Sequence, residues 1–503
     1  MTQLAPRPDT QERRPDASTR PAPAPNPHRR PPRRATLAAW WWAVISALAV
    51  VGAVAGGLPQ TAELVLVVAF GLVLVAVCLV YEEIAWAALV LALSANGIKF
   101  QLGGLTMLPE HLAIILAAVH LVLNARATKV RPLSVGKAVL AGAALIVLWW
   151  VLSFGISLAA ALQPEQSVRL LTWVLANIVA AVLVCLLRTP TVALVRVGVT
   201  VATVAAVIDL VGWLASSKAG ALSVFTERDY ASNQFRLQGL GSEPNVAAAF
   251  FVIWLCVAYA ASKRIPAPLI WTYLVLSGVC VYLTYTRIAW LMFAFVALGL
   301  ALRMLRGSRF FLVFAVLGVA VAVALVAYVL SLSSTSGSGA AAFLARLDSL
   351  QNLDSGTGAL RLSTANVAVA DLNTLHGWFS GFGYNAFPQH HDTGVTSYAT
   401  PYLALLWLAL FYDSGFVGAV PFILGYLLLW GGTARARSTW FFLVFALAST
   451  TTNIIWFAFP WVAGALLVRL SSKEAQDTQD APAEESAQST GAPRAARTAL
   501  TAR

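Results

Sequence analysis

The feature that most constrains this chain is a succession of long apolar runs between residues 38 and 470. Each run has about 15 to 25 residues, enough for a helix that crosses the ~30 Å hydrocarbon core of a bilayer. Hydrophobic residues make up 59% of the chain and charged residues 11%, whereas about a quarter of a soluble domain is charged. Because lipid offers no hydrogen bonds to the backbone, such runs must be helical. The sequence therefore predicts an all-α polytopic membrane protein.

The apolar runs predict about 12 to 14 transmembrane helices, since a few of the runs are short. The candidate spans are residues 38–58, 62–80, 84–96, 108–124, 138–158, 169–187, 191–214, 244–262, 267–285, 288–303, 309–331, 401–430, 438–451 and 454–470. Two polar segments flank the transmembrane domain, 37–470. The Pro/Arg-rich arm 1–36 and the tail 471–503 are both predicted to be disordered.

Clusters of basic residues alternate along the spans, which indicates the orientation of the chain because cytoplasmic loops carry an excess of Lys and Arg. The clusters expected inside are Arg29 to Arg34, Arg126 to Lys137, Lys263 and Arg264, Arg303 to Arg309, and Arg435 and Arg437. One alternation accommodates all of them and places both termini in the cytoplasm. It places residues 216–243, 284–287 and 331–401 on the outer face. The net charge of +12 then reflects orientation, and nucleic-acid binding is not expected.

Three arginines depart from this rule because they lie on the outer side: Arg236, Arg287 and Arg361. An arginine near the membrane interface carries a desolvation cost unless it has a partner. The planar guanidinium offers a fork of donors that suits phosphate oxygens. If the three arginines converge at the mouth of one cavity, they form a diphosphate clamp. Alternatively, each reaches lipid headgroups or pairs with a nearby acid.

The large outer loop, 331–401, contains the candidates for a general base. Residues 341–350 and 359–374 have helical periodicity, so the loop is predicted to be partly helical. A histidine suits the activation of a hydroxyl near neutral pH. The candidate bases are Asp371, His376, His390, His391 and Asp392, each of which could instead be a solvated loop residue. No metal site is expected, because adjacent histidines rarely converge on one ion without a third ligand elsewhere.

Four short motifs follow one another on the predicted outer side. They are an Arg-x-x-Gly loop followed by Glu-Pro-Asn (Arg236, Gly239, Glu243, Pro244, Asn245), a Thr-x-Thr-Arg at a helix start (Thr284, Thr286, Arg287), an Arg followed by Gly-x-Gly-x-x-x-Phe (Arg361, Gly381, Gly383, Phe387), and an acidic-x-Gly-x-x-Gly (Asp413, Gly415, Gly418). Glycines allow close backbone approach, and Glu-Pro-Asn suits a helix N-terminus, which favours anions. Together the motifs resemble the O-antigen ligase and Wzy-type polymerase superfamily of bacterial envelope glycosyltransferases, over residues 60–470.

The resemblance implies a reaction at the outer face of the cytoplasmic membrane. A glycan on a polyprenyl diphosphate, such as undecaprenyl diphosphate, is transferred to an acceptor hydroxyl without a nucleotide sugar or a metal. In ligases the acceptor is a glycolipid, and in polymerases it is the growing glycan. The outer arginines then hold the diphosphate, and a residue of the large loop deprotonates the acceptor.

The chain has Thr286 where the family's second motif has Ser, and it departs from the family more seriously in one other place. Many relatives carry His-Asn just before the helix that follows the large loop, where this chain reads Thr396 to Tyr402 without a histidine. Either the upstream histidines take this role, or an acidic residue does, or transfer activity is lost. Two other functions therefore stay open, a flippase for lipid-linked sugars and a non-catalytic envelope assembly protein. A flippase needs charges at mid-span, where Asp209, near an outer end, is the partial exception among apolar residues.

Overall fold

The computed structural model describes residues 60–102, 105–124, 135–219, 225–229, 234–305, 356–391, 403–433 and 435–472. The chain divides into two compact units, Met1–Gly71 and Leu72–Arg503, and all packing described below lies within the second. Several predictions fall outside the described residues: the arm 1–36, the spans 38–58 and 309–331, the helix 341–350, Asp392, and the tail from residue 473.

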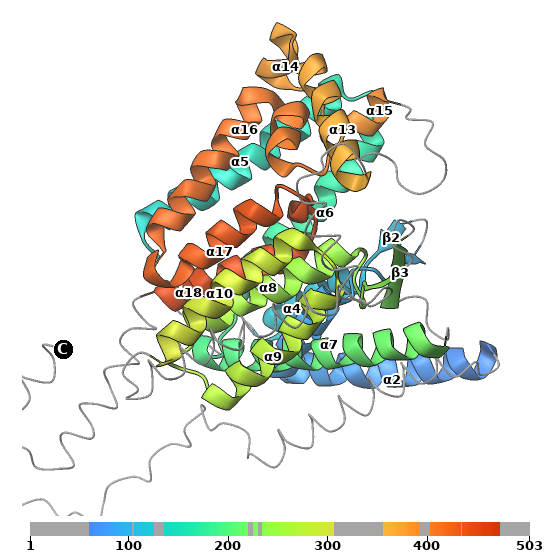
Figure 1. Ribbon diagram of the computed structural model, residues 1–503, viewed down its shortest axis with the longest axis vertical. Coiled ribbons are helices and arrows are strands. Elements are labelled where there is room, and N and C mark those ends of the chain that lie inside the picture. Colours follow the sequence, from blue (N-terminus) through green and yellow to red (C-terminus); the bar gives the residue numbers. More distant parts are fainter. Residues whose placement is uncertain are drawn as a thin grey trace, which may run out of the picture. The chain divides into compact units, whose positions relative to one another are not determined.

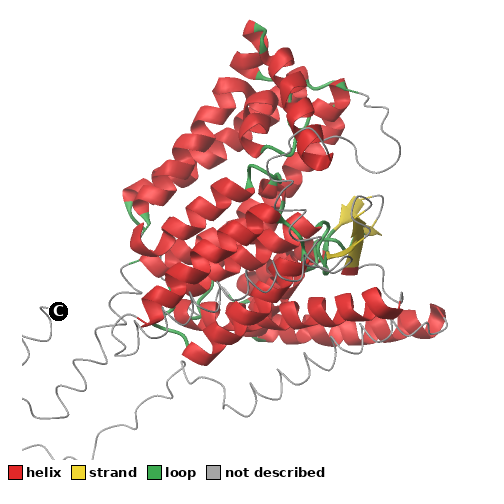
Figure 2. Cartoon of the chain, in the orientation of Figure 1, coloured by secondary structure: helices red, strands yellow, loops and turns green. Residues whose placement is uncertain are grey.

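Helices make up most of the described chain (Figures 1 and 2). They are α2 (Gln60–Val80), α3 (Glu82–Ser94), α4 (Pro109–Leu123), α5 (Lys137–Ala160), α6 (Pro164–Leu186), α7 (Thr191–Ala219), α8 (Pro244–Ala260), α9 (Ala267–Leu283), α10 (Arg287–Leu305), α13 (Gly356–Leu372), α14 (Leu375–Ser380), α15 (Phe387–His390), α16 (Leu406–Gly432), α17 (Arg435–Ala448) and α18 (Ala458–Ser471), with a 3₁₀ turn at Ile454–Trp456. Every candidate span within the described residues coincides with one of these helices, with shifted ends. The helix expected at 359–374 is α13.

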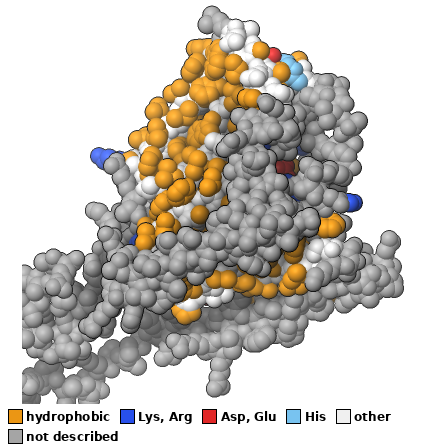
Figure 3. All heavy atoms as spheres, viewed as in Figure 1, with side chains coloured by type: hydrophobic (Ala, Val, Ile, Leu, Met, Phe, Trp, Pro, Cys, Tyr) orange, Lys and Arg blue, Asp and Glu red, His pale blue; other side chains and the backbone are white. Residues whose placement is uncertain are grey.

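Five described helices are long and apolar enough to cross a membrane, namely α5, α6, α7, α10 and α16. Shorter apolar helices include α4, α8, α9, α17 and α18. Large hydrophobic side chains stay exposed along α5 and α16, among them Val151 and Leu424, and Figure 3 shows hydrophobic side chains covering this face. A soluble protein rarely exposes so large an apolar patch. These faces indicate a lipid environment, while the total of 12 to 14 spans stays a prediction.

Three helices begin with proline: Pro109 in α4, Pro164 in α6 and Pro244 in α8. The first N–H groups of a helix have no partner within it, and proline has no N–H to leave unpaired. All three starts lie at ends that the charge pattern places on the outer side.

Two antiparallel hairpins add to the predicted all-α architecture. Strands β1 (Phe100–Leu102) and β2 (Leu105–Met107) pair in one, and β3 (Thr226–Asp229) and β4 (Gln234–Leu237) in the other. The second hairpin lies in the predicted outer loop 216–243, which is therefore partly strand, and α7 extends into its beginning. Its register places Arg236 opposite Glu227, where opposite charges stabilise a strand pair.

Helix α8 forms the core of the second unit. It is buried along nearly its whole length and packs against α7, α9, α10, α17 and α18. The Trp254 ring lies 6.4 Å from that of Trp86, and the Phe250 ring lies 5.8 Å from that of Phe459. A helix that is apolar all round is buried by its neighbours, so α8 is the helix around which the others assemble.

Helices α5 and α16 pack closely because glycines face each other. A Cβ on Gly142 would lie 2.8 Å from the Gly425 carbonyl oxygen, and a Cβ on Gly425 would lie equally close to that of Gly142. Small residues are the usual means by which membrane helices approach closely. This contact fixes α16, which carries part of the site described below.

Gly142→Val is expected to lower the stability of the folded protein by about 1–3 kcal/mol, because the new side chain must push α5 and α16 apart. Thermal unfolding of the detergent-purified protein measures the change. Gly155→Val is the matched control on the same helix, since a Cβ there meets open space. Equal losses in the two variants would contradict close α5–α16 packing through Gly142.

Candidate functional site

Asp371, His391 and Tyr412 form one hydrogen-bonded set. The Asp371 Oδ2 atom lies 2.6 Å from His391 Nε2 and 2.9 Å from the Tyr412 hydroxyl, which donates to it. The side chains of Asp371 and His391 are 28% and 27% exposed, so both are reachable from outside. Among the candidate bases, the fold thus brings together two that are 20 residues apart.

The proton arrangement in this set follows from the ionisation of Asp371. A carboxylate accepts hydrogen bonds, so His391 Nε2 donates its proton to Asp371 when the acid is ionised. A neutral imidazole then carries its lone pair on Nδ1, where it can accept a further proton. An aspartate in this position also stabilises the imidazolium that forms, as in other acid–histidine pairs.

Three elements position these side chains. Asp371 lies in the last turn of α13, His391 directly follows α15, and Tyr412 lies in the second turn of α16. The buried Phe387 ring supports the arrangement, with its centroid 4.7 Å from the His391 ring and 5.4 Å from the Tyr412 ring. In Figure 1 these elements lie together near the end of the α5–α16 pair.

Helix α16 is broken at Gly415, whose φ of 54° and ψ of −164° are not helical. The segment between α14 and α15 pairs with the backbone at this break. Phe382 N–H donates to the Tyr412 carbonyl and Gly383 N–H donates to the Asp413 carbonyl, each at 2.9 Å. The predicted Gly-x-Gly and acidic-x-Gly motifs therefore pack directly against each other. Glycine is required at position 381, because its φ is positive, 70°, and an added Cβ would lie 2.6 Å from Ser414 N.

The carboxylate of Asp413 holds the same segment from the other side. It accepts hydrogen bonds from the backbone N–H groups of Asn385 and Ala386 and is buried. Next to them, Tyr384 N–H donates to Ser157 Oγ on α5 at 2.9 Å. Asp413 was expected as a supporting residue, and its contacts are those of a residue that fixes the loop.

The two remaining histidines of the loop differ in position. The His390 ring lies against Phe382, with centroids 5.3 Å apart. Desolvation lowers the pKa of His390, although Asp371 acts in the opposite direction. His376 is exposed on α14, and its Nδ1 lies 2.9 Å from Ser380 Oγ. Within the described residues, no hydrogen bond or ion pair joins the His376 side chain to the Asp371–His391 pair.

Arg236 is tied to the turn that precedes Arg287. Its Nε donates to the Thr284 carbonyl at 3.0 Å, and its Nη1 lies 3.9 Å from Glu227 Oε1. Burial lowers the pKa of Arg236, whereas Glu227 and Glu243 raise it. The first two predicted motifs are therefore in contact, and Glu243 acts on Arg236 through its charge.

The other residues of the first motif shape the loop before α8. Gly239 has a φ of 64° and lies so close to the Asp209 carboxylate that a Cβ would collide with it. Asp209 Oδ1 accepts the Leu240 N–H at 3.0 Å. Asn245 Oδ1 accepts the Thr286 hydroxyl at 2.9 Å and so joins this loop to the turn before α10. Asp209, the partial exception among the apolar mid-span residues, thus has a structural partner.

The third arginine lies on a different element. Arg287 is the first residue of α10, whereas Arg361 lies on α13, which packs against α14 and α16. Both side chains are partly exposed. The hydrogen bonds above join the Arg236 and Arg287 segments, while the convergence of all three arginines stays a prediction.

Predicted site residues thus meet in the Asp371–His391–Tyr412 set and in the Arg236–Thr284 contact before α10. No family model matches the chain, and no curated protein matches its sequence. The geometry of the residues has to support any function by itself.

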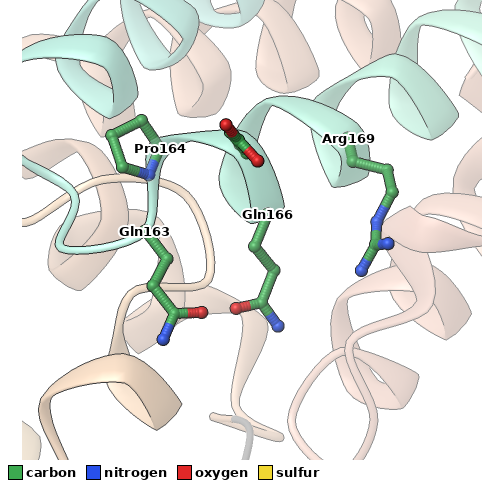
Figure 4. A pocket seen from close by; sticks show the side chains of 5 residues that line it. Gln163, Pro164, Gln166 and Arg169 are labelled. Carbon is green, nitrogen blue, oxygen red and sulfur yellow. The ribbon is translucent and has the colours of Figure 1, made fainter.

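Two residues of interest were missed in the sequence. Tyr412 precedes the predicted Asp413, but nothing local indicates that its hydroxyl meets Asp371. Arg169 lies in the second turn of α6 and lines a cavity of about 660 Å³ with Gln163, Pro164, Glu165 and Gln166 (Figure 4). The charge alternation places this end of α6 outside, so Arg169 is a further outer arginine that the same rule could have found.

Gly381→Ala is expected to destabilise the protein by about 1–3 kcal/mol, because its backbone conformation is nearly exclusive to glycine and the added Cβ would meet the backbone of α16. Limited proteolysis and thermal unfolding measure the loss, with Gly155→Ala as the control. A Gly381→Ala protein as stable as that control would contradict the contact between the loop and the break.

Acidification is expected to destabilise the protein partly through His390. Its pKa is lowered by folding, so as the pH falls through the ordinary histidine pKa of about 6.5, the unfolded state takes up a proton before the folded state does. Stability therefore decreases as the pH falls through this window and levels off below the folded pKa. Melting temperatures between about pH 5 and 7.5 should fall less for His390→Gln than for the wild type. Parallel curves would contradict the shift.

Proposed function

We propose that this protein is a membrane glycosyltransferase that transfers a glycan from a polyprenyl diphosphate to an acceptor hydroxyl at the outer face of the cytoplasmic membrane. The observation that carries the proposal is the Asp371–His391–Tyr412 set, in which Asp371 and His391 come from the loop expected to supply the base. The apolar faces of α5 and α16 add a lipid environment, as a polyprenyl carrier requires.

The set suits general-base catalysis. His391 Nδ1 takes the proton of the acceptor hydroxyl while Nε2–H stays bonded to Asp371. The acceptor oxygen forms a bond to the anomeric carbon of the glycan, and the bond between that carbon and the diphosphate oxygen breaks. The bonding electrons leave with the diphosphate. The proton on His391 is later released to water or to the departing diphosphate, so that the base is restored.

The outer arginines suit the leaving group. The polyprenyl diphosphate gains negative charge as the glycosidic bond breaks, and preorganised cationic donors stabilise such charge most effectively. Arg287 stands at the N-terminus of α10, where the helix dipole also favours an anion. Arg236 supports the same turn, and Arg361, on the helix of Asp371, is the third residue assigned to the diphosphate.

His391→Ala is expected to slow transfer by about 10²–10⁴-fold, the usual contribution of a general base. Arg287→Ala is expected to slow it by about 10²–10³-fold, through lost stabilisation of the leaving group. The assay supplies polyprenyl-diphosphate glycan to the purified protein and measures released polyprenyl diphosphate together with glycan transfer. His376→Ala, an exposed histidine of the same loop, serves as the control.

Each outcome of this assay bears on the proposal. Release by the wild type and by His376→Ala, lost in the other two variants, supports it, and product lengths then separate a polymerase from a ligase. Wild-type protein that releases nothing with any acceptor but moves the lipid-linked glycan across a liposome bilayer would reject the enzyme in favour of a carrier. Equal activity of His391→Ala and wild type would reject the assigned base.

A further inference from the structure

Two cavities meet at one arginine. The first, of about 660 Å³, is lined by residues 163–166 and Arg169 at the start of α6. The second, of about 250 Å³, is lined by Arg169 together with Met107, His111, Ile114, Ile115, Thr172, Trp173 and Ala176. Within the described residues, no hydrogen bond or ion pair engages the Arg169 guanidinium, which is exposed. Because Arg169 lines both cavities, one ligand with an anionic group could bind the guanidinium and extend into each cavity.

Four of the five residues that line the first cavity have polar side chains. Two amides, from Gln163 and Gln166, the carboxylate of Glu165 and the Arg169 guanidinium line it, and Figure 4 shows the ends of Gln163, Gln166 and Arg169 projecting to the same side. Amides and carboxylates supply both donors and acceptors, as a ring of sugar hydroxyls requires. Its volume lies within the range of pockets for small ligands.

The second cavity is a mostly apolar groove between two helices. On α4 it is lined by His111, Ile114 and Ile115, and on α6 by Thr172, Trp173 and Ala176. These spacings of three and four residues place each set on one helix face. The rings of His111 and Trp173 face each other with centroids 5.7 Å apart. A hydrocarbon chain fits such a groove.

We propose that the two cavities form one binding site for a lipid-linked acceptor glycan. The terminal sugars occupy the polar cavity, the lipid chain enters the groove between α4 and α6, and Arg169 binds the anionic group that joins them. A ligand in which sugar, anion and hydrocarbon follow one another matches all three parts at once. The assignment of this ligand as the acceptor rests on the proposed function.

The polar cavity is joined to the proposed base by a short path. Gln389, two residues before His391, accepts the Gln163 N–H at 2.8 Å and donates to Ser167 Oγ at 3.0 Å. Through these bonds the residues that line the cavity and the segment that carries His391 are held together. An acceptor held here would have its sugar next to the group that must remove its proton, as catalysis by proximity requires.

A binding experiment tests the site directly. The probe is farnesyl-phosphate-linked N-acetylglucosamine with a diazirine at the chain end, added to the full-length protein in nanodiscs and followed by mass spectrometry of the labelled peptides. Labelling of α4 and α6 is expected to need roughly tenfold more probe for Arg169→Gln, equivalent to about 1.4 kcal/mol. Arg196→Gln, an exposed arginine that lines neither cavity, should behave as the wild type.

A second pair of variants tests the groove. Ile115→Trp fills it and should reduce labelling, whereas Val122→Trp, a more exposed residue of the same helix outside the groove, should not. Diazirine derivatives of farnesyl phosphate and of phosphatidylglycerol are the comparisons. If phosphatidylglycerol labels the groove as strongly as the probe and depends equally on Arg169, the arginine is a headgroup anchor and the proposal is wrong.

The transfer assay separates this proposal from the proposed function. For an active enzyme, Arg169→Gln should raise the half-saturating concentration of acceptor roughly tenfold with turnover at saturation little changed. Arg169-dependent labelling of a protein that never releases polyprenyl diphosphate would support the site as a lipid-linked-sugar site and reject the transferase. If the wild type is active, and Arg169→Gln changes neither the labelling nor the dependence on acceptor concentration, the proposed binding site is wrong while the proposed transferase stands.

Discussion

The candidate site depends on the pairing between the break in α16 and the segment before α15. A helix that breaks inside an apolar bundle leaves carbonyl oxygens without their usual partners, and each such group costs several kcal/mol in hydrocarbon. Here the N–H groups of Phe382 and Gly383 donate hydrogen bonds to the carbonyl oxygens of Tyr412 and Asp413. The break in α16 is therefore stable only with these hydrogen bonds from the loop. The same hydrogen bonds fix the conformation of the loop.

This mutual requirement explains how a loop can hold the Asp371–His391–Tyr412 set in one arrangement. Tyr412 lies just before the break and extends its hydroxyl to Asp371, while Asp413, the next residue, binds the backbone of Asn385 and Ala386. Two adjacent residues of α16 thus bind the end of α13 and the segment just before α15. Further along the same helix, the close contact with α5 through Gly425 anchors the assembly in the bundle.

Local patterns in the sequence predicted the local structure well. The apolar runs predicted the helices, and the periodicity of 359–374 predicted α13. The glycine motifs marked four backbone positions with positive φ, namely Gly239, Gly381, Gly383 and Gly415. The choice of His391 among five candidate bases could not be predicted, because it depends on where the chain returns after α13. Arg169 was overlooked because the span was begun at residue 169, although Pro164 indicates an earlier helix start.

The contacts of Arg236 and Arg287 also differ, although the sequence analysis assigned both residues to diphosphate binding. Arg236 holds the Thr284 carbonyl and has the charges of Glu227 and Glu243 nearby, which partly neutralise its effect on a distant anion. Arg287 begins α10, where the macrodipole opposes a cation and a bound anion removes that opposition. Arg236 is therefore suited to fix the turn and Arg287 to meet the anion. Binding of a diphosphate would then stabilise the start of α10, so the same contact that favours the leaving group would also order the turn that presents it.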